Sequence, residues 1–266
     1  MTIGLIGCGK MGSALTRGAI KAGVFEARQV LAYDPVPAAI TALGHNITAA
    51  HSLNEVIHNS DVLLLCVKPG EVSGVLSKIP ANIATPDELL VVSIAAGVTI
   101  AAMEESSQNK ARIVRCMPNT PALVGEGAAA FSLGSLATQA DADFTEKLLG
   151  SIGIVYQVKE ALIDTVTGLS GSGPAYVYTF IEALADGALL EGLPRDQALA
   201  LATQTVLGAA RMVADSGLHP AILRDRVTSP GGTTIAGLAA LEEGAFRSTT
   251  IKAVKAATEK ARELGR

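Results

Sequence analysis

The stretch IGLIGCGKMG, from Ile3 to Gly12, decides the fold of this 266-residue chain. Its first four residues are typical of a buried strand, and the glycines after them read G-x-G-x-x-G before a helix-like segment. Gly7 permits a tight turn, Gly9 lets a ligand reach the backbone, and Gly12 lets the helix pack on the strand. Strand, loop and helix N-terminus together predict a site for the pyrophosphate of a dinucleotide. The expected binding residues of this loop are Gly7, Gly9, Lys10, Met11 and Gly12.

Strand-like runs alternate with helix-like segments through the first half of the chain, which predicts βαβ units. The runs are apolar almost continuously rather than at every second residue, as expected when helices cover both faces of a parallel sheet. We therefore predict an α/β fold with an N-terminal Rossmann-type, doubly wound, mostly parallel sheet. The predicted strands are Ile3 to Ile6, Val30 to Tyr33, Val62 to Val67, Leu89 to Ile94, Ile113 to Cys116, Ala128 to Leu133 and Ile152 to Gln157, with a helix from Asp141 to Leu149.

Strand signals vanish after residue 160, and the rest of the chain reads as helices. Pro174 and Pro194 suit first helical turns, whereas Gly192 and Gly217 suit C-terminal stops. We predict a dinucleotide-binding domain at residues 1–160 and an all-helical substrate-binding and dimerisation domain at residues 161–266. The predicted helices run from Pro174 to Glu191, from Pro194 to Ser216, from Ile235 to Glu243, and finally through Leu264.

The pattern of one of these helices predicts a homodimer. From Arg195 to Asp215 the sequence carries apolar or small residues on nearly every helical face, which is typical of a buried helix. A domain of roughly a hundred residues cannot surround such a helix by itself. We therefore expect two copies of the chain to associate through the helical domain.

Composition and charge exclude several classes of partner. The formal charge is −4 and Lys and Arg form no cluster, which argues against a nucleic acid or an anionic membrane and favours a small-molecule substrate. The first apolar run breaks at a glycine turn, so we expect neither a signal peptide nor a membrane span. The three cysteines form no C-x-x-C pair, which favours a reducing, cytoplasmic location. No metal is expected, because the spacing of His45, His51, His58 and His219 is not that of a metal site.

Further candidate residues lie at the carboxyl ends of predicted strands, where open α/β sheets bind ligands. Asp34 follows the second strand, where an acid can bind the adenosine ribose hydroxyls and favours NAD over NADP. Because Asp34 precedes Pro35, a purely structural role as a turn start is an equal alternative. The other expected cofactor-binding residues are Val67, Lys68 and Pro69 after the fourth strand, Ala95 and Gly97 after the fifth, and Asn119 after the sixth.

The segment Ser229 to Thr234 reads as an anion receptor. Ser229 suits a helix N-cap and Pro230 the first helical position, while the glycines that follow free the backbone for a ligand. Successive N–H groups at such a helix start can hold a carboxylate without a cationic side chain. A capped helix that binds nothing is the alternative.

Taken together, these motifs resemble the pyrroline-5-carboxylate reductase family over essentially the entire chain. The likeness is carried by Ile6 to Gly12, Val67 to Pro69, Met117 to Pro121, Gly171 to Tyr176 and Arg224 to Glu242, and its most specific part is Asp225 to Thr234. The resemblance implies a Rossmann domain followed by a helical dimerisation domain, dimers that assemble into larger rings, and a role in proline biosynthesis. It also implies that Asn54 lies near the adenosine ribose, and that Ser229, Gly232, Thr233 and Thr234 contact the substrate.

The expected reaction is the NADPH- or NADH-dependent reduction of 1-pyrroline-5-carboxylate to L-proline, the last step of proline biosynthesis. The substrate carboxylate is expected on N–H groups around Gly232 and Thr233, with Gly231 allowing close approach and Thr234 holding the ring nitrogen. The family commonly uses NADPH, but no Arg follows the second strand here to bind a 2′-phosphate. Two alternatives remain: a β-hydroxyacid dehydrogenase, although Gly168 to Leu190 contains no Lys, and a dinucleotide sensor without turnover.

Overall fold

The computed structural model describes residues 1–44 and 46–265, which form two compact units. The first unit comprises Met1–Ser172 together with Lys255–Arg266, and the second comprises Gly173–Val254. The boundary expected at residue 160 lies inside the first unit, because the helical segment that follows it packs on the sheet. As limits of the two domains, residues 1–160 and 161–266 stay a prediction.

The first unit is built on an eight-stranded sheet with the strand order β3-β2-β1-β4-β5-β6-β7-β8. Neighbouring strands are parallel except β6 and β7, which confirms the predicted mostly parallel, doubly wound sheet. The strands are β1 (Ile3–Ile6), β2 (Val30–Tyr33), β3 (Thr48–Ala49), β4 (Val62–Leu65), β5 (Leu90–Ser93), β6 (Arg112–Met117), β7 (Gly127–Leu133) and β8 (Gly153–Gln157). The sequence pattern missed the two-residue β3, whose residues are both exposed.

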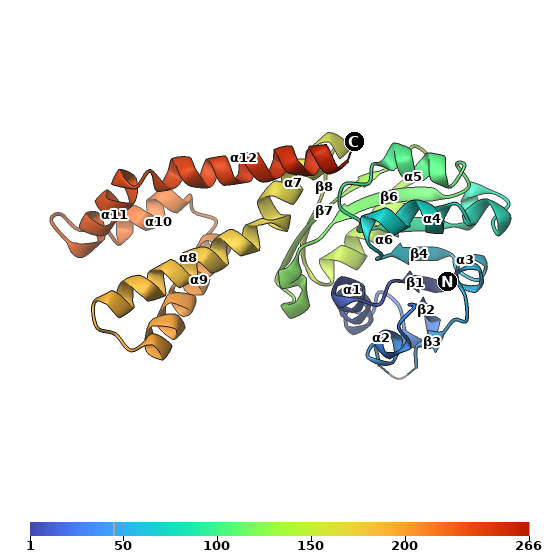
Figure 1. Cartoon of the computed structure of the whole chain (residues 1–266), viewed down its shortest axis with the longest axis horizontal. Coiled ribbons are helices and arrows are strands. Elements are labelled where there is room, and N and C mark those ends of the chain that lie inside the picture. The colour runs from blue at the N-terminus through green and yellow to red at the C-terminus, as the bar shows by residue number, and fades with distance from the viewer. Residues whose placement is uncertain (45, 266) are drawn as a thin grey trace. The chain divides into compact units, whose positions relative to one another are not determined.

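Helices cover both faces of this sheet (Figure 1). Alternate side chains of each central strand enter two separate cores, as Leu64 and Leu65 of β4 show, which is why the strands read as continuous apolar runs. One face is covered by α1 (Lys10–Lys21), α2 (Pro37–Thr41) and α6 (Gln139–Gly150). The other is covered by α3 (Leu53–His58), α4 (Val72–Leu76) and α5 (Ile100–Ser106).

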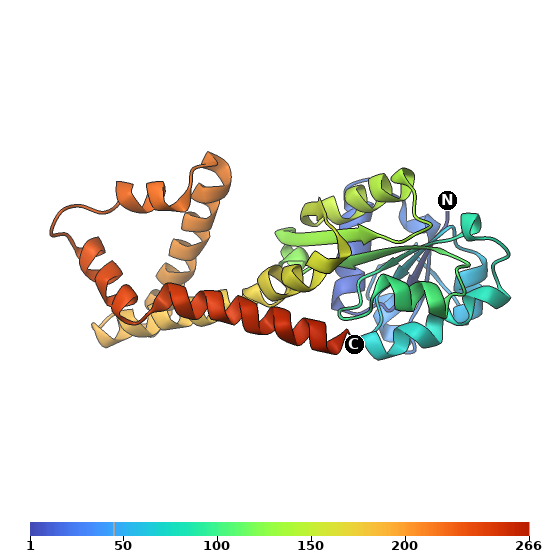
Figure 2. The ribbon, with the colours of Figure 1, turned by 90° about the horizontal axis from the view of Figure 1, so that it is seen from above.

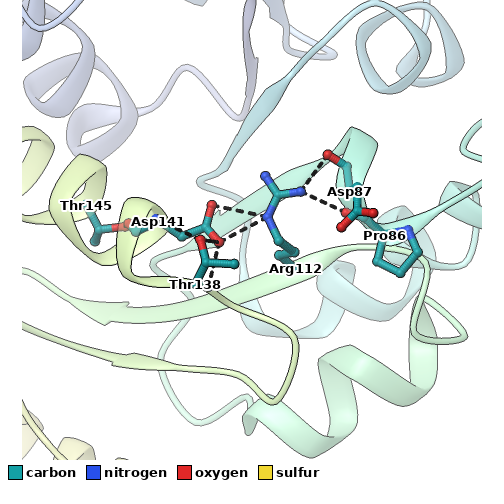
Figure 3. Close-up of polar contacts among 6 residues, drawn as sticks. All are labelled: Pro86, Asp87, Arg112, Thr138, Asp141 and Thr145. Carbon is teal, nitrogen blue, oxygen red and sulfur yellow. Dashed lines mark hydrogen bonds and ion pairs between the residues drawn. The ribbon is translucent and has the colours of Figure 1, made fainter.

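A largely buried ion pair connects three segments of the first unit (Figure 3). Nε of Arg112 in β6 donates to both carboxylate oxygens of Asp141, at 3.2 and 3.0 Å. Its Nη1 donates to the carbonyl oxygens of Pro86 and Asp87, at 2.9 and 2.7 Å. Asp141 also accepts from the backbone N–H of Thr138, the N-cap residue of α6. One guanidinium therefore connects a central strand, a helix start and a loop.

The segment that links the sheet to the second unit is helical. It consists of α7 (Ile163–Val166) and a π-helical turn, Thr167–Gly171. The buried Arg115 of β6 donates to Glu160 at 3.1 Å and to Asp164 at 2.9 Å, which ties α7 to the sheet. These bonds explain why the segment belongs to the first unit.

The second unit consists entirely of helices (Figure 2). They are α8 (Gly173–Leu190), α9 (Arg195–Ser216), α10 (Pro220–Arg226), α11 (Thr233–Glu243) and the first part of α12 (Phe246–Leu264). Pro174 lies in the first turn of α8, and Gly217 ends α9 with a φ of +62°, as predicted. The sequence pattern missed α10.

Little of the second unit is buried within the single chain. Its core consists of Ala185, Ala198 and Ala202 of the α8–α9 hairpin, with partly buried neighbours. The large side chains of α9 are exposed, including Leu207 and Met212 at 59% each. Among the described helices, none combines the length and the apolar character that a membrane span needs.

Candidate active site

The glycine loop after β1 is closely packed at two positions and open at the third. Gly7 has a φ of +93°, and a Cβ atom there would lie 2.5 Å from the carbonyl oxygen of Cys66. A Cβ atom on Gly12 would overlap the carbonyl oxygen of Gly7. Apart from Gly9 and its two chain neighbours, no described residue has an atom within 4 Å of the place that a Cβ atom on Gly9 would take. Of these three glycines, Gly7 and Gly12 therefore fit tightly against backbone, and Gly9 borders open space.

That space lies at the start of α1. Gly9 is the N-cap residue in an extended conformation, and no side chain of the described residues caps the helix. The first N–H groups of an α-helix have no partner within the helix and carry the positive end of its dipole. An uncapped helix start beside open space fits the pyrophosphate of a dinucleotide. Lys10, exposed, and Met11, half-buried, are the first two residues of this helix.

Asp34 lies at the end of β2 and binds the glycine loop. Its Oδ2 accepts the backbone N–H of Cys8 at 2.8 Å, and its Oδ1 accepts that of Val36 at 2.9 Å. The second bond is the turn that an Asp-Pro sequence favours, so the structural role left open by the sequence is present. Each carboxylate oxygen keeps further acceptor capacity, so a ribose contact is compatible with both bonds.

The other candidates after β4 and β5 gather beside the same loop. Because β4 pairs with β1 and β5 with β4, the carboxyl ends of these parallel strands are neighbours. Val67 is half-buried, Lys68 and Pro69 are exposed, and Ala95 is buried. Gly97 has a φ of +77°, and the backbone of Leu264 packs 3.4 Å from the position of its absent Cβ atom. The end of α12 therefore lies against the loop after β5.

Burial also affects the thiols near the loop. It raises the pKa of Cys8 to about 12, with the carboxylate of Asp34 adding to the effect. It likewise raises the pKa of Cys66 to about 12 and raises that of Cys116. These thiols keep their protons at neutral pH and are poor nucleophiles.

Asn119 has a structural use of its amide that the sequence did not reveal. Its Oδ1 accepts the backbone N–H of Ala128 at 2.9 Å, and its Nδ2 donates to the carbonyl oxygen of Ser170 at 3.0 Å. Pro174 lies four residues after Ser170 and has no N–H to donate to that carbonyl. Asn119 thus supplies a donor that the proline cannot, and connects β7 to the π-helical turn.

Asn54 lies in the first turn of α3 and is exposed. The N-cap residue of this helix is Ser52, whose side chain accepts the backbone N–H of Glu55 at 3.2 Å. Helix α3 packs on the face of the sheet opposite to α1.

The anion receptor expected in the helical region has a different construction from the one predicted. Ser229 is not an N-cap residue, and Pro230 is not the first helical residue. Gly232 donates its N–H to the carbonyl oxygen of Ser229 at 3.1 Å, and Gly231 has a φ of +66°. These features define a type II turn with Pro230 at its second position. The left-handed Gly231 prevents a helix from starting at Pro230, so α11 begins at Thr233.

This turn leaves the start of α11 open. Gly232 is the N-cap residue in an extended conformation, and no side chain of the described chain caps the helix. A Cβ atom at Gly232 would overlap Oγ of Ser229, so a side chain there would force that hydroxyl to turn aside. Thr233 is exposed and Thr234 half-buried in the first helical turn. The backbone N–H groups and two hydroxyls are therefore concentrated at one helix end.

Two family models match the chain. The model for pyrroline-5-carboxylate reductase dimerisation matches residues 160–264, and the model for NADP oxidoreductase, coenzyme F420-dependent, matches residues 2–97. Pyrroline-5-carboxylate reductase of Pisum sativum is 47% identical over 99% of this chain and 96% of its own length. The chain belongs to the pyrroline-5-carboxylate reductase family. This assignment confirms the resemblance noted in the sequence.

Solved structures of the family agree with this membership. Pyrroline-5-carboxylate reductase of Coxiella burnetii is 33% identical, covers 100% of this chain and 98% of its own, and superposes with a TM-score of 0.94. The Plasmodium falciparum enzyme, solved with NADP bound, is 34% identical with the same coverage and a TM-score of 0.88. The match to a dimerisation model confirms the helical region as a dimerisation domain. Among residues 1–44 and 46–265, no cluster of His, Cys, Asp or Glu could hold a metal ion; His45 lies outside the described residues.

Proposed function

We propose that this protein reduces 1-pyrroline-5-carboxylate to L-proline with NADPH or NADH, the last step of proline biosynthesis. The observation that carries the proposal is family-level similarity over 99% of the chain, together with two open helix starts that suit the anionic groups of cofactor and substrate. Each helix start is preceded by glycines rather than by a capping side chain. The protein therefore binds its anions through backbone N–H groups.

The cofactor half of the site is assigned to the first unit. We assign the pyrophosphate to the N–H groups at the start of α1, where Gly9 permits close approach. Asp34 and Asn54 are assigned to the adenosine ribose, and the loops after β4, β5 and β6 to the nicotinamide half. The proposed cofactor-binding residues are Gly7, Gly9, Lys10, Met11, Gly12, Asp34, Asn54, Val67, Lys68, Pro69, Ala95, Gly97 and Asn119.

The substrate half is assigned to the start of α11. The substrate carboxylate accepts hydrogen bonds from N–H groups around Gly232 and Thr233, and the positive end of the helix dipole stabilises its charge. Oγ1 of Thr234 holds the ring nitrogen by a hydrogen bond. The proposed substrate-binding residues are Ser229, Gly231, Gly232, Thr233 and Thr234, of which Thr234 is the catalytic one.

The proposed reaction depends mainly on the position of the imine relative to the nicotinamide. A protonated imine is already electrophilic, so the chain need not supply a strong acid, and none of the side chains from Ser229 to Thr234 is charged. The reduced nicotinamide supplies the hydride when it is bound. Backbone and hydroxyl groups at α11 fix the orientation of the imine carbon, and such positioning lowers the barrier to hydride transfer.

Assembly and location follow from the same assignment. We propose a homodimer through the helical domain, with dimers joining into a larger ring, as the family resemblance implies. A cytoplasmic location is supported by Cys8, Cys66 and Cys116, which are all free thiols.

Steady-state oxidation of NADPH and NADH, with and without 1-pyrroline-5-carboxylate, tests the reaction. We expect imine-dependent oxidation with L-proline as the product. A protein that binds a dinucleotide but oxidises neither form with the imine would be a sensor or act on another substrate, and the proposed function would be wrong.

The role of Thr234 is tested by Thr234→Val, which keeps the shape of the side chain and removes the hydroxyl. We expect turnover to fall by about 10- to 100-fold without loss of folding, because one positioned hydrogen bond is lost. Thr205→Val removes an exposed hydroxyl of α9 and serves as the control. Wild-type turnover in Thr234→Val would contradict the role of Thr234 but leave the function intact.

A further inference from the structure

The loop between β2 and α2 offers few groups to an anion. The backbone N–H of Val36 is already donated to Asp34 at 2.9 Å. Its neighbours Pro35 and Pro37 have no N–H at all. Helix α2 spans only the five residues Pro37–Thr41, too short for a substantial dipole. An additional phosphate near this loop would therefore find few backbone donors.

The charges around the loop are equally unfavourable to a phosphate. Asp34 is the only Asp, Glu, Lys or Arg from Val30 to Ala50. Arg17 of α1 brings a cation to α2, and its Nη2 donates to the carbonyl oxygen of Ala42. Ala42 is the C-cap residue of α2, at the end of the helix away from the loop. Lys10 lies at the start of α1, where the pyrophosphate is assigned.

Two hydrogen bonds oppose any rotation of Asp34 that would relieve the repulsion. Its two oxygens accept the N–H groups of Cys8 and Val36, so both the glycine loop and the turn hold the carboxylate in place. A carboxylate with spare acceptor capacity suits the 2′- and 3′-hydroxyls of an adenosine ribose. A 2′-phosphate is mainly a dianion at neutral pH and then has no proton to donate, so the same carboxylate repels it.

We propose that this enzyme binds NADH in preference to NADPH, with Asp34 as the residue that determines the choice. The proposal rests on the proposed function, since it concerns the cofactor of the same site. It departs from the Plasmodium falciparum relative, which was solved with NADP. The fixed acid and the donor-poor loop of this chain are the reasons for the difference.

Equilibrium binding of each dinucleotide in the absence of substrate tests the proposal. The fluorescence of the reduced nicotinamide gives both dissociation constants for the whole 266-residue chain. We expect NADH to bind at least about tenfold more tightly than NADPH, because one charge contact of this kind is commonly worth that factor. NADPH binding as tightly as NADH, or more tightly, would overturn the proposal, and imine reduction would still establish the proposed function. Binding of neither would overturn both.

Two variants assign the preference to the loop. Asp34→Asn removes the charge and retains an acceptor, so we expect the ratio of the two dissociation constants to fall at least about threefold. Val36→Arg places a cation on a side chain that is 58% exposed, leaves the backbone bonds of Asp34 in place, and should tighten NADPH binding specifically.

The control is Leu136→Arg, which adds the same charge to the first unit. Leu136 follows β7, which runs antiparallel to β6. It therefore lies at the end of the sheet where β6 begins, opposite to the carboxyl ends of the parallel strands. We expect this variant to keep the wild-type ratio. An unchanged ratio in both Asp34→Asn and Val36→Arg would exclude the loop as the determinant, even if NADH were preferred.

Discussion

At the scale of single residues, the glycine loop separates two uses of glycine. Gly7 and Gly12 are required by the fold, because a side chain at either would overlap a backbone carbonyl oxygen. Gly9 is not required by the fold, since its α-carbon faces open space. Packing therefore does not account for the absence of a side chain at Gly9, whereas the pyrophosphate site that we propose does.

This distinction predicts opposite effects of two alanine substitutions. Gly9→Ala should keep the thermal midpoint within about 2 °C and weaken dinucleotide binding at least about tenfold, because the methyl group enters the space assigned to the pyrophosphate. Gly12→Ala should lower the midpoint by several degrees, because the helix must move away from the strand. Thermal unfolding and cofactor titration of both variants check this. Equal loss of stability in the two would contradict our view of Gly9.

The raised thiol pKa values of Cys8 and Cys66 predict slow modification of the native protein. Both are about 12, so only a very small fraction is thiolate at pH 8, and a thiol-specific disulfide reagent should label native protein much more slowly than urea-unfolded protein. Thiols of the unfolded chain ionise with a pKa around 9.0, whereas the native thiols are still protonated at that pH. Stability should therefore fall as the pH rises above about 9.

The labelling experiment has its own contradicting outcome. Rapid labelling of all three thiols in native protein would show that burial does not protect them.

At the scale of elements, local sequence signals predicted those strands whose formation depends on local geometry. The strands over Ile3–Ile6 and Val30–Tyr33 match the prediction residue for residue, because continuous apolar runs between glycine and proline signals have few alternatives. Pro230 misled the prediction, since proline suits the second position of a type II turn as well as a helix start. The positive φ of Gly231 selects the turn over the helix start, and the sequence shows only that a glycine can adopt such a φ.

Contacts between distant segments could not be predicted from the sequence. The amide of Asn119 joins residues 128 and 170, and nothing near Asn119 in the sequence indicates either partner. The predicted nicotinamide contact of Asn119 remains a prediction, now beside a structural use of the same side chain. Sequence motifs suggested the cofactor-binding residues. Only the structure showed the hydrogen bond that fixes the position of Asp34.

The ion pair of Arg112 and Asp141 predicts a large loss of stability when it is broken. The side chains are only 17% and 7% exposed, so Arg112→Met leaves a buried carboxylate unpaired and should cost about 3–5 kcal/mol. Arg28→Met removes an exposed pair with Glu26 and should cost less than about 1 kcal/mol. Thermal midpoints at one protein concentration compare the two. Equal midpoints would mean that the buried pair contributes no more than the exposed one.

At the scale of the whole molecule, the two units differ in how they bury apolar surface. The first unit has two extensive cores, one on each face of its sheet. The second unit has three buried alanines in its described core, while leucines and a methionine of α9 are exposed. Such a small core cannot offset the conformational entropy of more than eighty ordered residues. The missing burial must come from association, which is what the dimerisation family match indicates.

We therefore expect Leu207→Asp to cause loss of the dimer rather than a local defect. Leu207 is 59% exposed in the single chain, so a charge there costs the monomer little, but burying an unpaired carboxylate in an interface costs several kcal/mol. Sedimentation velocity should show the wild-type dimer shifting toward monomer, with faster proteolysis confined to the helical region. Leu123→Asp, at a first-unit leucine that is 52% exposed, is the matched control and should remain dimeric. If Leu207→Asp sedimented as the wild-type dimer, this face of α9 would lie outside the interface, and the exposed apolar surface of α9 would need another explanation than dimerisation.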